Sequence, residues 1–400
     1  MTPVFCCGFE CGIFGLNGQH FTQSNANIST STVRSGSRSA QINITNADGQ
    51  ITSQGLASSS IWVIRVYVRF GQLPNNVCEI VTADFTGVYF NNADNKLYCG
   101  TGISGLAASG SAVISTNTWY RIDVKVDLSV KSADAQIDGS DIAQATSGAG
   151  SATTNFVLAV RNTSGAEVVT ANVFFDDVVV SQTSGDYPIG AGYVNHFVPT
   201  ADGTHNIAGA NDFERTLTGV DITNATTDAY LLVDDIPLIT SDVSAVSCVN
   251  MVAPANATDY VECQFGPAPG IGTPSSGPRA VEFIGTLQTA SAGGSPTMDI
   301  SLRTNDNGTI SDVFTSSVFY QPSTPVFKRV HYATAPSTGT AWSATLFNAF
   351  KVRMGSFDAA DTAPDGYFGT MMLEAEFEEI PVIANKIYSV NQAVKRAAYW

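Results

Sequence analysis

Three glutamates alternate near the end of the chain, at Glu374, Glu376 and Glu378. Alternate residues of a β-strand point to the same side, so these carboxylates are predicted to share one face. A retaining glycoside hydrolase needs two carboxyl groups about 5 Å apart. The intervening positions, however, form an apolar stripe of Met371, Leu373, Ala375 and Phe377. An apolar face opposite an acidic one is typical of a half-exposed strand, so we predict a solvated acidic face and no catalytic residues.

Four aspartates could offer oxygen ligands to calcium. Asp138 and Asp141 follow one predicted strand, and Asp176 and Asp177 lie in another. A calcium site needs about six to eight converging oxygens. Adjacent aspartates more commonly accept backbone hydrogen bonds or face solvent. We therefore predict no metal and no cofactor, with calcium at these four aspartates left open as the alternative.

Cysteine and histidine supply the other reactive groups. Cys6, Cys7 and Cys11 could bind a soft metal, but no fourth ligand stands at a suitable spacing. The four histidines are His20, His196, His205 and His331, without an H-E-x-x-H pair, and the sequence has no G-x-S-x-G motif. We predict that the cysteines are small buried hydrophobic residues and that the histidines are structural. A triad assembled from distant residues stays open, since spacing does not reveal it.

Three aromatic residues are candidates for ligand binding. Trp119 falls on the polar side of its predicted strand, and Tyr187 and Tyr193 lie near a turn-rich segment. Aromatic rings combine a large apolar area with, in tyrosine and tryptophan, a polar group, so these residues could stack on sugars. The alternative is that Trp119 packs against a loop or a neighbouring subunit.

The elements that must position these residues are predicted to be strands. Residues 119–128 and 61–70 alternate apolar with polar side chains, which indicates strands with one dry and one wet face. In residues 61–70 the polar side carries Arg65, Tyr67 and Arg69. Further strands are predicted in the first half at 4–9, 27–33, 78–83, 88–91, 96–100, 156–161 and 172–181. Short alternating strands without helices between them favour a two-sheet β-sandwich.

The second half repeats this pattern after the turn-rich residues 185–192. Strands are predicted there at 259–264, 279–289, 298–303, 313–320, 328–332, 350–354 and 370–379, whereas residues 193–240 are mixed. The final residues change character, because Ile387, Val390 and Val394 stand at helical spacing before Tyr399 and Trp400. We therefore predict a sandwich domain over 1–185, a second β-rich domain over 186–382 and a docking tail over 383–400, whose interface residues are these five.

The composition and net charge of the chain argue against several classes of function. The net charge of −16 disfavours nucleic acid and anionic membranes, which attract basic surfaces. The hydrophobic fraction of 44% and the charged fraction of 14% indicate a folded chain. The start of the chain lacks a signal-peptide pattern, and no run is long and apolar enough to span a membrane, so we expect folding in the cytosol.

Several stretches resemble bacteriophage virion proteins that carry a concanavalin A-like, laminin-G-like jelly-roll domain. In the first half they include V-F-C-C-G-F-E-C-G at 4–12, T-V-R-S-G-S-R-S-A-Q-I-N at 32–43 and F-F-D-D-V-V-V-S at 174–181. In the second half they include D-Y-V-E-C at 259–263 and P-R-A-V-E-F-I-G-T-L-Q-T-A at 278–290. The resemblance implies an all-β chain with an N-terminal jelly roll and a structural role in a tailed-phage particle. No calcium or sugar site of such relatives can be located in this sequence.

On this basis we predict a non-enzymatic structural subunit of a virion, assembled in the host cytoplasm as a capsid decoration or particle-surface protein. Its partners would be its own copies, possibly in a trimer, and other capsid or tail proteins. Two alternatives belong to other classes. One is a tail module that binds a receptor or a host-surface glycan, and the other is a glycan-degrading enzyme on the same sandwich.

Overall fold

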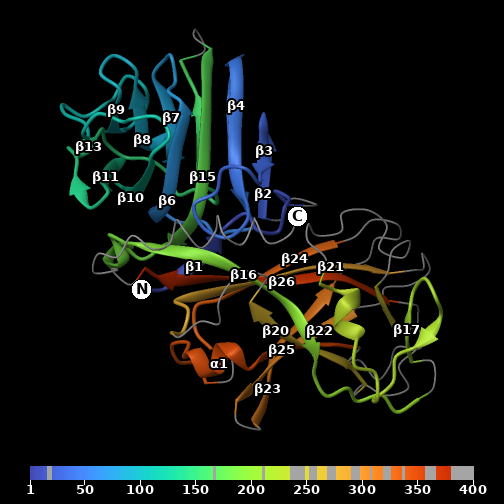
Figure 1. Ribbon diagram of the computed structural model, residues 1–400. Coiled ribbons are helices and arrows are strands. Elements are labelled where there is room, and N and C mark those ends of the chain that lie inside the picture. Colours follow the sequence, from blue (N-terminus) through green and yellow to red (C-terminus); the bar gives the residue numbers. More distant parts are fainter. Residues whose placement is uncertain are drawn as a thin grey trace, which may run out of the picture.

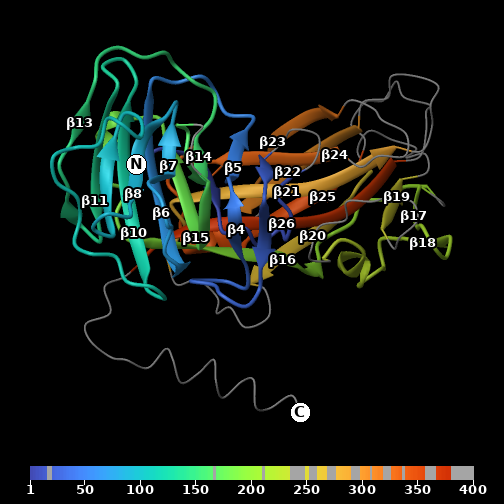
Figure 2. The same ribbon diagram turned by 90° about the horizontal axis from the view of Figure 1, so that it is seen from above.

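A computed structural model describes residues 1–15, 20–164, 168–209, 212–234, 248–251, 259–267, 276–289, 298–306, 309–318, 326–335, 338–355 and 366–379. The chain is almost entirely β-structure, arranged in two bodies that lie side by side (Figures 1 and 2). This confirms the predicted all-β fold of the β-sandwich type. The predicted tail and its interface residues Ile387, Val390, Val394, Tyr399 and Trp400 lie outside the described residues.

The first body is a sandwich of two antiparallel sheets. One sheet has the order β12-β11-β10-β6-β15-β4-β3, with β1 paired to β15 and β13 paired to β11, and the other has the order β2-β5-β14-β7-β8-β9. The strands are β1 (Pro3–Cys7), β2 (His20–Ser24), β3 (Ala26–Ser29), β4 (Ser39–Ala47), β5 (Gly49–Gln54), β6 (Ile61–Gln72), β7 (Cys78–Ala83), β8 (Thr86–Asn91), β9 (Lys96–Gly100), β10 (Trp119–Asp127), β11 (Ser132–Ile137), β12 (Ser140–Asp141), β13 (Ala145–Thr146), β14 (Val157–Arg161) and β15 (Val169–Ser181).

The core of this sandwich lies between the two sheets. The apolar side of β10, predicted from its alternation, supplies Ile122, Val124 and Val126, and β6 supplies Trp62 and Phe70. The facing sheet contributes buried residues from β5, β7, β8 and β14. Because two-residue alternation aims every second side chain at the facing sheet, the sequence pattern alone accounts for this core.

The second body is built on one long antiparallel sheet. Its main path runs β18-β17-β19-β26-β16-β20-β25-β22-β23, while β21 pairs with β26 and with β24. The strands are β16 (Gly192–Asp202), β17 (Phe213–Arg215), β18 (Val220–Asp221), β19 (Val249–Met251), β20 (Val261–Pro267), β21 (Ala280–Thr289), β22 (Met298–Asp306), β23 (Thr309–Val318), β24 (Val326–Tyr332), β25 (Phe350–Met354) and β26 (Gly366–Glu378).

This sheet curls around its own core. Tyr332 on β24 and Phe350 on β25 belong to strands far apart in the sheet order, yet their ring centroids are 6.3 Å apart. One short helix, α1 (Ala344–Asn348), closes the core with Phe347. Two 3₁₀ turns, η1 (Ser184–Asp186) and η2 (Ala229–Leu232), complete the described elements. No helix among the described residues is both long and apolar enough to cross a membrane.

A short connection joins the two bodies between Ser181, where β15 ends, and Gly192, where β16 begins. The predicted boundary at 185/186 falls inside this connection. Strand β1 lies at the junction of the bodies (Figure 1). It pairs with β15 of the first body, while the backbone N–H of its Cys6 donates to Glu282 of β21 at 3.2 Å. The N-terminal segment therefore belongs structurally to both bodies.

The junction corrects the predicted wet faces of two strands. On β6, Arg65 is fully buried and Tyr67 is 6% exposed, and on β26 both Glu374 and Glu376 are fully buried. Only Glu378, at the end of the strand, is exposed. The alternation along each strand was predicted correctly, but each polar face packs against the other body rather than against water. The alternation shows that one face of a strand is apolar, but it does not show whether the polar face meets water or another part of the protein.

Candidate functional site

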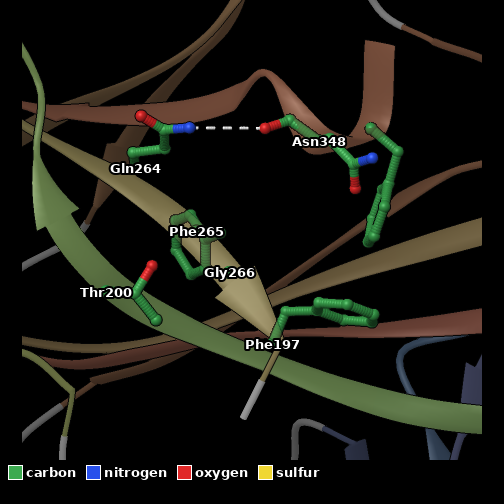
Figure 3. Close-up of a pocket in the computed structure, with 7 residues that line it drawn as sticks. Phe197, Thr200, Gln264, Phe265, Gly266 and Asn348 are labelled. Atoms are coloured by element: carbon green, nitrogen blue, oxygen red, sulfur yellow. Dashed lines mark hydrogen bonds between the residues drawn. The ribbon is translucent and has the colours of Figure 1, made fainter. Parts of the chain in front are cut away.

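A cavity of about 210 Å³ opens in the second body between β16, β20 and α1. Its lining consists of Phe197 and Thr200 from β16, Gln264, Phe265 and Gly266 from β20, and Phe347 and Asn348 from α1. Figure 3 shows these side chains arranged around a common space. The volume is below the roughly 300–1,000 Å³ typical of sites for drug-sized ligands, so the cavity suits a ligand of about one ring.

Local features of three separate elements shape this cavity. The pairing of β16 with β20 shifts register between Pro199 and Ala201, which is the irregularity of a β-bulge and places Thr200 at the rim. Helix α1 is capped at its N-terminus by Ser343, whose side chain accepts a hydrogen bond from the backbone N–H of Leu346. Such an N-cap satisfies a free N–H group of the first turn and so stabilises a helix this short.

The floor of the cavity is aromatic and its rim is polar. The rings of Phe197 and Phe347 meet edge to face with centroids 4.7 Å apart. At the rim, Gln264 Nε2 donates to the backbone oxygen of Asn348 at 3.4 Å, and Gln264 and Asn348 are partly exposed. Amide side chains both donate and accept hydrogen bonds. The cavity therefore offers groups that donate and accept hydrogen bonds at its rim, above phenyl rings that are almost fully buried.

The sequence did not single out any of these lining residues. Phe197, Phe265 and Phe347 lie on elements that share no sequence pattern, and only the fold brings them together. A serine followed by the helix formers Ala344 and Leu346 was the one local indication of α1.

A cluster of buried charged groups lies elsewhere, between the two bodies. Glu376 of β26 binds Arg65 of β6, with Arg65 Nη1 2.7 Å from Glu376 Oε1. Its second oxygen accepts from Arg279 Nε at 2.7 Å, and Arg279 Nη2 also contacts Oε1. Two arginines thus neutralise one buried carboxylate and tie it to both bodies.

Two further glutamates extend this cluster. Glu282 of β21 lies 2.7 Å from His331 Nδ1 and 3.6 Å from Arg329 Nη1. Glu374 accepts hydrogen bonds from the backbone N–H groups of Gly8 and Glu10. Burial, and then the nearby Glu10 carboxylate, raise the pKa of Glu374 to about 8. Cys7, His20 and Glu374 also lie together, with one potential ligand atom from each within 4.8 Å of the others.

The structure does not bring the four calcium candidates together. Asp176 and Asp177 are fully buried at a bulge in β15, where Asp177 Oδ2 binds Arg34 Nη1 at 2.6 Å. Asp138 and Asp141 are exposed near β11 and β12, bonded to Arg121 and Gln136 respectively. Two strands, β6 and β10, separate the pairs, a distance of about 14 Å at the usual strand spacing.

The three candidate sugar-binding aromatics also lie apart. Trp119 pairs with Arg69 at one end of β10, whereas Tyr187 lies under Lys125, six residues further along, with Lys125 Nζ 5.1 Å from the ring centroid. Tyr193 stacks on Phe377 of the second core, with centroids 5.6 Å apart. Tyr187 and Tyr193 thus have partners within the chain, and the three rings form no common platform.

The chain is similar to several solved structures at low sequence identity. No family model matches the chain, and no curated protein matches it. Among similar solved structures, a sialidase has 11% identity over 40% of this chain and 17% of its own, with a TM-score of 0.31. Trypanosoma rangeli sialidase in complex with sialic acid has 12% identity, coverage of 39% and 27%, and a TM-score of 0.29. The cellulose induced protein Cip1 has 15% identity, coverage of 45% and 97%, and a TM-score of 0.29.

These comparisons correct the predicted function. The chain spans about a quarter or less of the sialidases it matches, and the similar structures are sialidases and a cellulose-induced protein rather than virion components. The prediction of a structural subunit of a virion was therefore wrong, whereas the prediction that the chain is not an enzyme stays a prediction. Self-association through the tail stays a prediction, because its residues lie outside the described part of the chain.

Proposed function

We propose that this protein is a carbohydrate-binding protein that holds one neutral sugar ring of a glycan in the cavity between β16, β20 and α1. The observation that carries the proposal is the combination of an aromatic floor, Phe197, Phe265 and Phe347, with a hydroxyl and amide rim, Thr200, Gln264 and Asn348. The site and not the fold supports this function, since a sandwich fold hosts many unrelated activities.

The chemistry of a sugar matches both parts of the cavity. The C–H face of a pyranose ring is apolar and packs against aromatic carbon, while its hydroxyl groups donate and accept hydrogen bonds at the ring edge. A hexose has about 12 non-hydrogen atoms, and about 0.3 kcal/mol for each gives a Kd of about 2 mM. Such weak binding at one cavity is useful on a glycan that presents many copies of the sugar.

Charge favours a neutral sugar over an acidic one. None of the described lining residues is charged, and the chain as a whole carries a net charge of −16. An anionic sugar would meet no cation in the cavity and an unfavourable overall field. We therefore expect neutral hexose oligosaccharides to bind and sialylated ones to be excluded.

Binding rather than hydrolysis is proposed because no titratable side chain lines the cavity within the described residues. General acid catalysis needs a carboxyl group within reach of the glycosidic oxygen. Glu374 and Glu376, which could have formed a carboxylate pair, are buried between the two bodies.

The test is a titration of the full chain with neutral and sialylated oligosaccharides, followed by ligand-observed NMR. Gln264→Ala and Asn348→Ala should each weaken neutral-sugar binding by about tenfold, the equivalent of one hydrogen bond. The matched control is Gln182→Ala, which removes a similar bond, from Gln182 Nε2 to the backbone oxygen of Ala57, in the first body.

Unchanged binding by both cavity variants, or no binding of any neutral sugar, would overturn the proposal. Release of free sugar from the oligosaccharides by the wild-type chain would instead identify an enzyme.

A further inference from the structure

Cys7 and His20, near the start of the chain, meet Glu374, near its end, in the interior of the protein. Cys7 ends β1, His20 begins β2, and Glu374 lies on β26 of the second body. Cys7 Sγ is 3.2 Å from His20 Nε2, and one ligand atom from each of the three side chains lies within 4.8 Å of the other two. All three residues are fully buried.

All three side chains are removed from water, and a buried polar group is costly unless it has a partner. Glu282, Glu376 and Asp177 at the same junction each contact an arginine. Glu374 accepts hydrogen bonds from the backbone N–H groups of Gly8 and Glu10, but among the described residues it forms no ion pair with an arginine, lysine or histidine, which sets it apart from these three carboxylates.

We propose that Cys7, His20 and Glu374 bind a zinc ion that links the two bodies of the protein. One thiolate, one neutral imidazole and one carboxylate are each established Zn²⁺ ligands, and the 3.2 Å between Cys7 Sγ and His20 Nε2 allows both atoms to bind one ion. The two negative ligands balance the charge of a divalent ion, so the buried site is neutral as a whole. Calcium and magnesium prefer all-oxygen sites, which excludes them here.

The surroundings would hold these ligands in place. The backbone N–H of Phe9 donates to Cys7 Sγ at 3.2 Å, and the N–H of Glu10 donates to Glu374 Oε1 at 2.8 Å. The His20 ring packs against Phe5 and Phe21, with centroids 5.5 and 4.7 Å away. Hydrogen bonds and packing of this kind orient metal ligands and lower the cost of assembling the site.

A zinc ion at this position would cross-link the two bodies at their junction. Cys7 and His20 belong to the two sheets of the first body, whereas Glu374 belongs to the second. An ion that binds only the folded arrangement stabilises it by mass action, so its removal should loosen the attachment of the two bodies. This inference does not depend on sugar binding, because the cavity between β16, β20 and α1 shares no residue with the zinc site.

The experiment measures zinc directly in the full chain purified after expression with added zinc. Elemental analysis should find about one zinc per chain in the wild type. The content should fall to background in Cys7→Ala and in Glu374→Gln, and a chelator should lower the melting temperature of the wild type but not of these variants. The matched control is Cys78→Ala, since Cys78 is also fully buried but lies in the core of the first body.

Replacement of zinc by cobalt tests the ligand set without any substitution. A cysteine thiolate bound to Co²⁺ gives a charge-transfer absorption, which is expected in the wild type even if a variant fails to fold. Wild-type protein that holds no zinc above the Cys7→Ala level, or cobalt-loaded protein without the thiolate band, would overturn the proposal.

Discussion

Arg65 and Glu376 illustrate how single residues hold the two bodies together. Each is fully buried, and they meet at 2.7 Å across the junction. The added Cβ of any residue replacing Gly192 would lie 2.2 Å from Arg65 Nη1, so this glycine leaves the guanidinium its space. Burying a charge is costly, and the pair is tolerated because each member compensates the other. Removing one partner should therefore cost more than the pair itself contributes.

We predict that Glu376→Gln destabilises the protein by about 3–5 kcal/mol, because it leaves Arg65 buried without its counter-charge. The measurement is the free energy of unfolding in urea. Glu378→Gln is the matched control, since Glu378 lies two residues further along the same strand but is exposed. It should change stability by no more than about 0.5 kcal/mol. Equal effects of the two substitutions would show that Glu376 is solvated after all.

At the scale of elements, most strands could be predicted from the sequence. The predicted strand at 350–354 coincides with β25, and the strand predicted at 279–289 differs from β21 by one residue. Strand β16 was missed because Gly192–Asp202 combines a proline with an irregular polar pattern, and both of its sides are largely buried. Helix α1 was missed because five residues are too few for a periodic pattern.

The candidate site could not be predicted from the sequence, because no single element supplies its residues. Its lining residues lie on three elements that share no sequence pattern, and their meeting depends on how the long sheet curls. Likewise, most of the chain separates Glu374 from Cys7 and His20. Spacing along the sequence reveals a site only when one element supplies several of its residues.

The bulge in β15 contains a buried aspartate whose effect on the free energy of unfolding can be tested by varying the pH. Between Asp176 and Val179 the pairing with β6 shifts register, and Asp177 adopts a φ of 52°. Asp176 is fully buried there and accepts hydrogen bonds from the backbone N–H groups of Arg34 and Asp177. Burial, and then the neighbouring Asp177 carboxylate, raise the pKa of Asp176 well above its ordinary value of 3.8.

A raised pKa means that the folded protein binds this proton more tightly than the unfolded chain does. The stability that Asp176 contributes is therefore complete below about pH 4 and is lost as pH rises through the folded-state pKa. We predict that Asp176→Asn makes the decline in unfolding free energy above about pH 4 shallower, by up to about 1.4 kcal/mol per pH unit. Asp141→Asn, at an exposed position, should leave the decline as it is in the wild type. Parallel pH profiles of the two variants would contradict this assignment.

For the whole molecule, the N-terminal segment decides whether the two bodies behave as one. Its strand β1 is hydrogen-bonded into the first body through β15, and its Cys6, Gly8 and Glu10 N–H groups donate to Glu282 and Glu374 of the second. A small apolar cluster, including Val63, Val179, Val194 and Ala280, fills the rest of the junction. Neither body can therefore unfold without exposing buried charges and apolar surface of the other.

We predict that the described bodies unfold in one cooperative transition. Hydrogen exchange should then give the same opening free energy for the slowest amides of β6 and of β26, because both exchange only through global unfolding. Leu158→Ala, a substitution in the core of the first body alone, should lower protection in both strands by about 2–5 kcal/mol. If the bodies were independent, the same substitution would reduce protection in β6 and leave β26 unchanged. The junction would then be only a contact between two separately folded units.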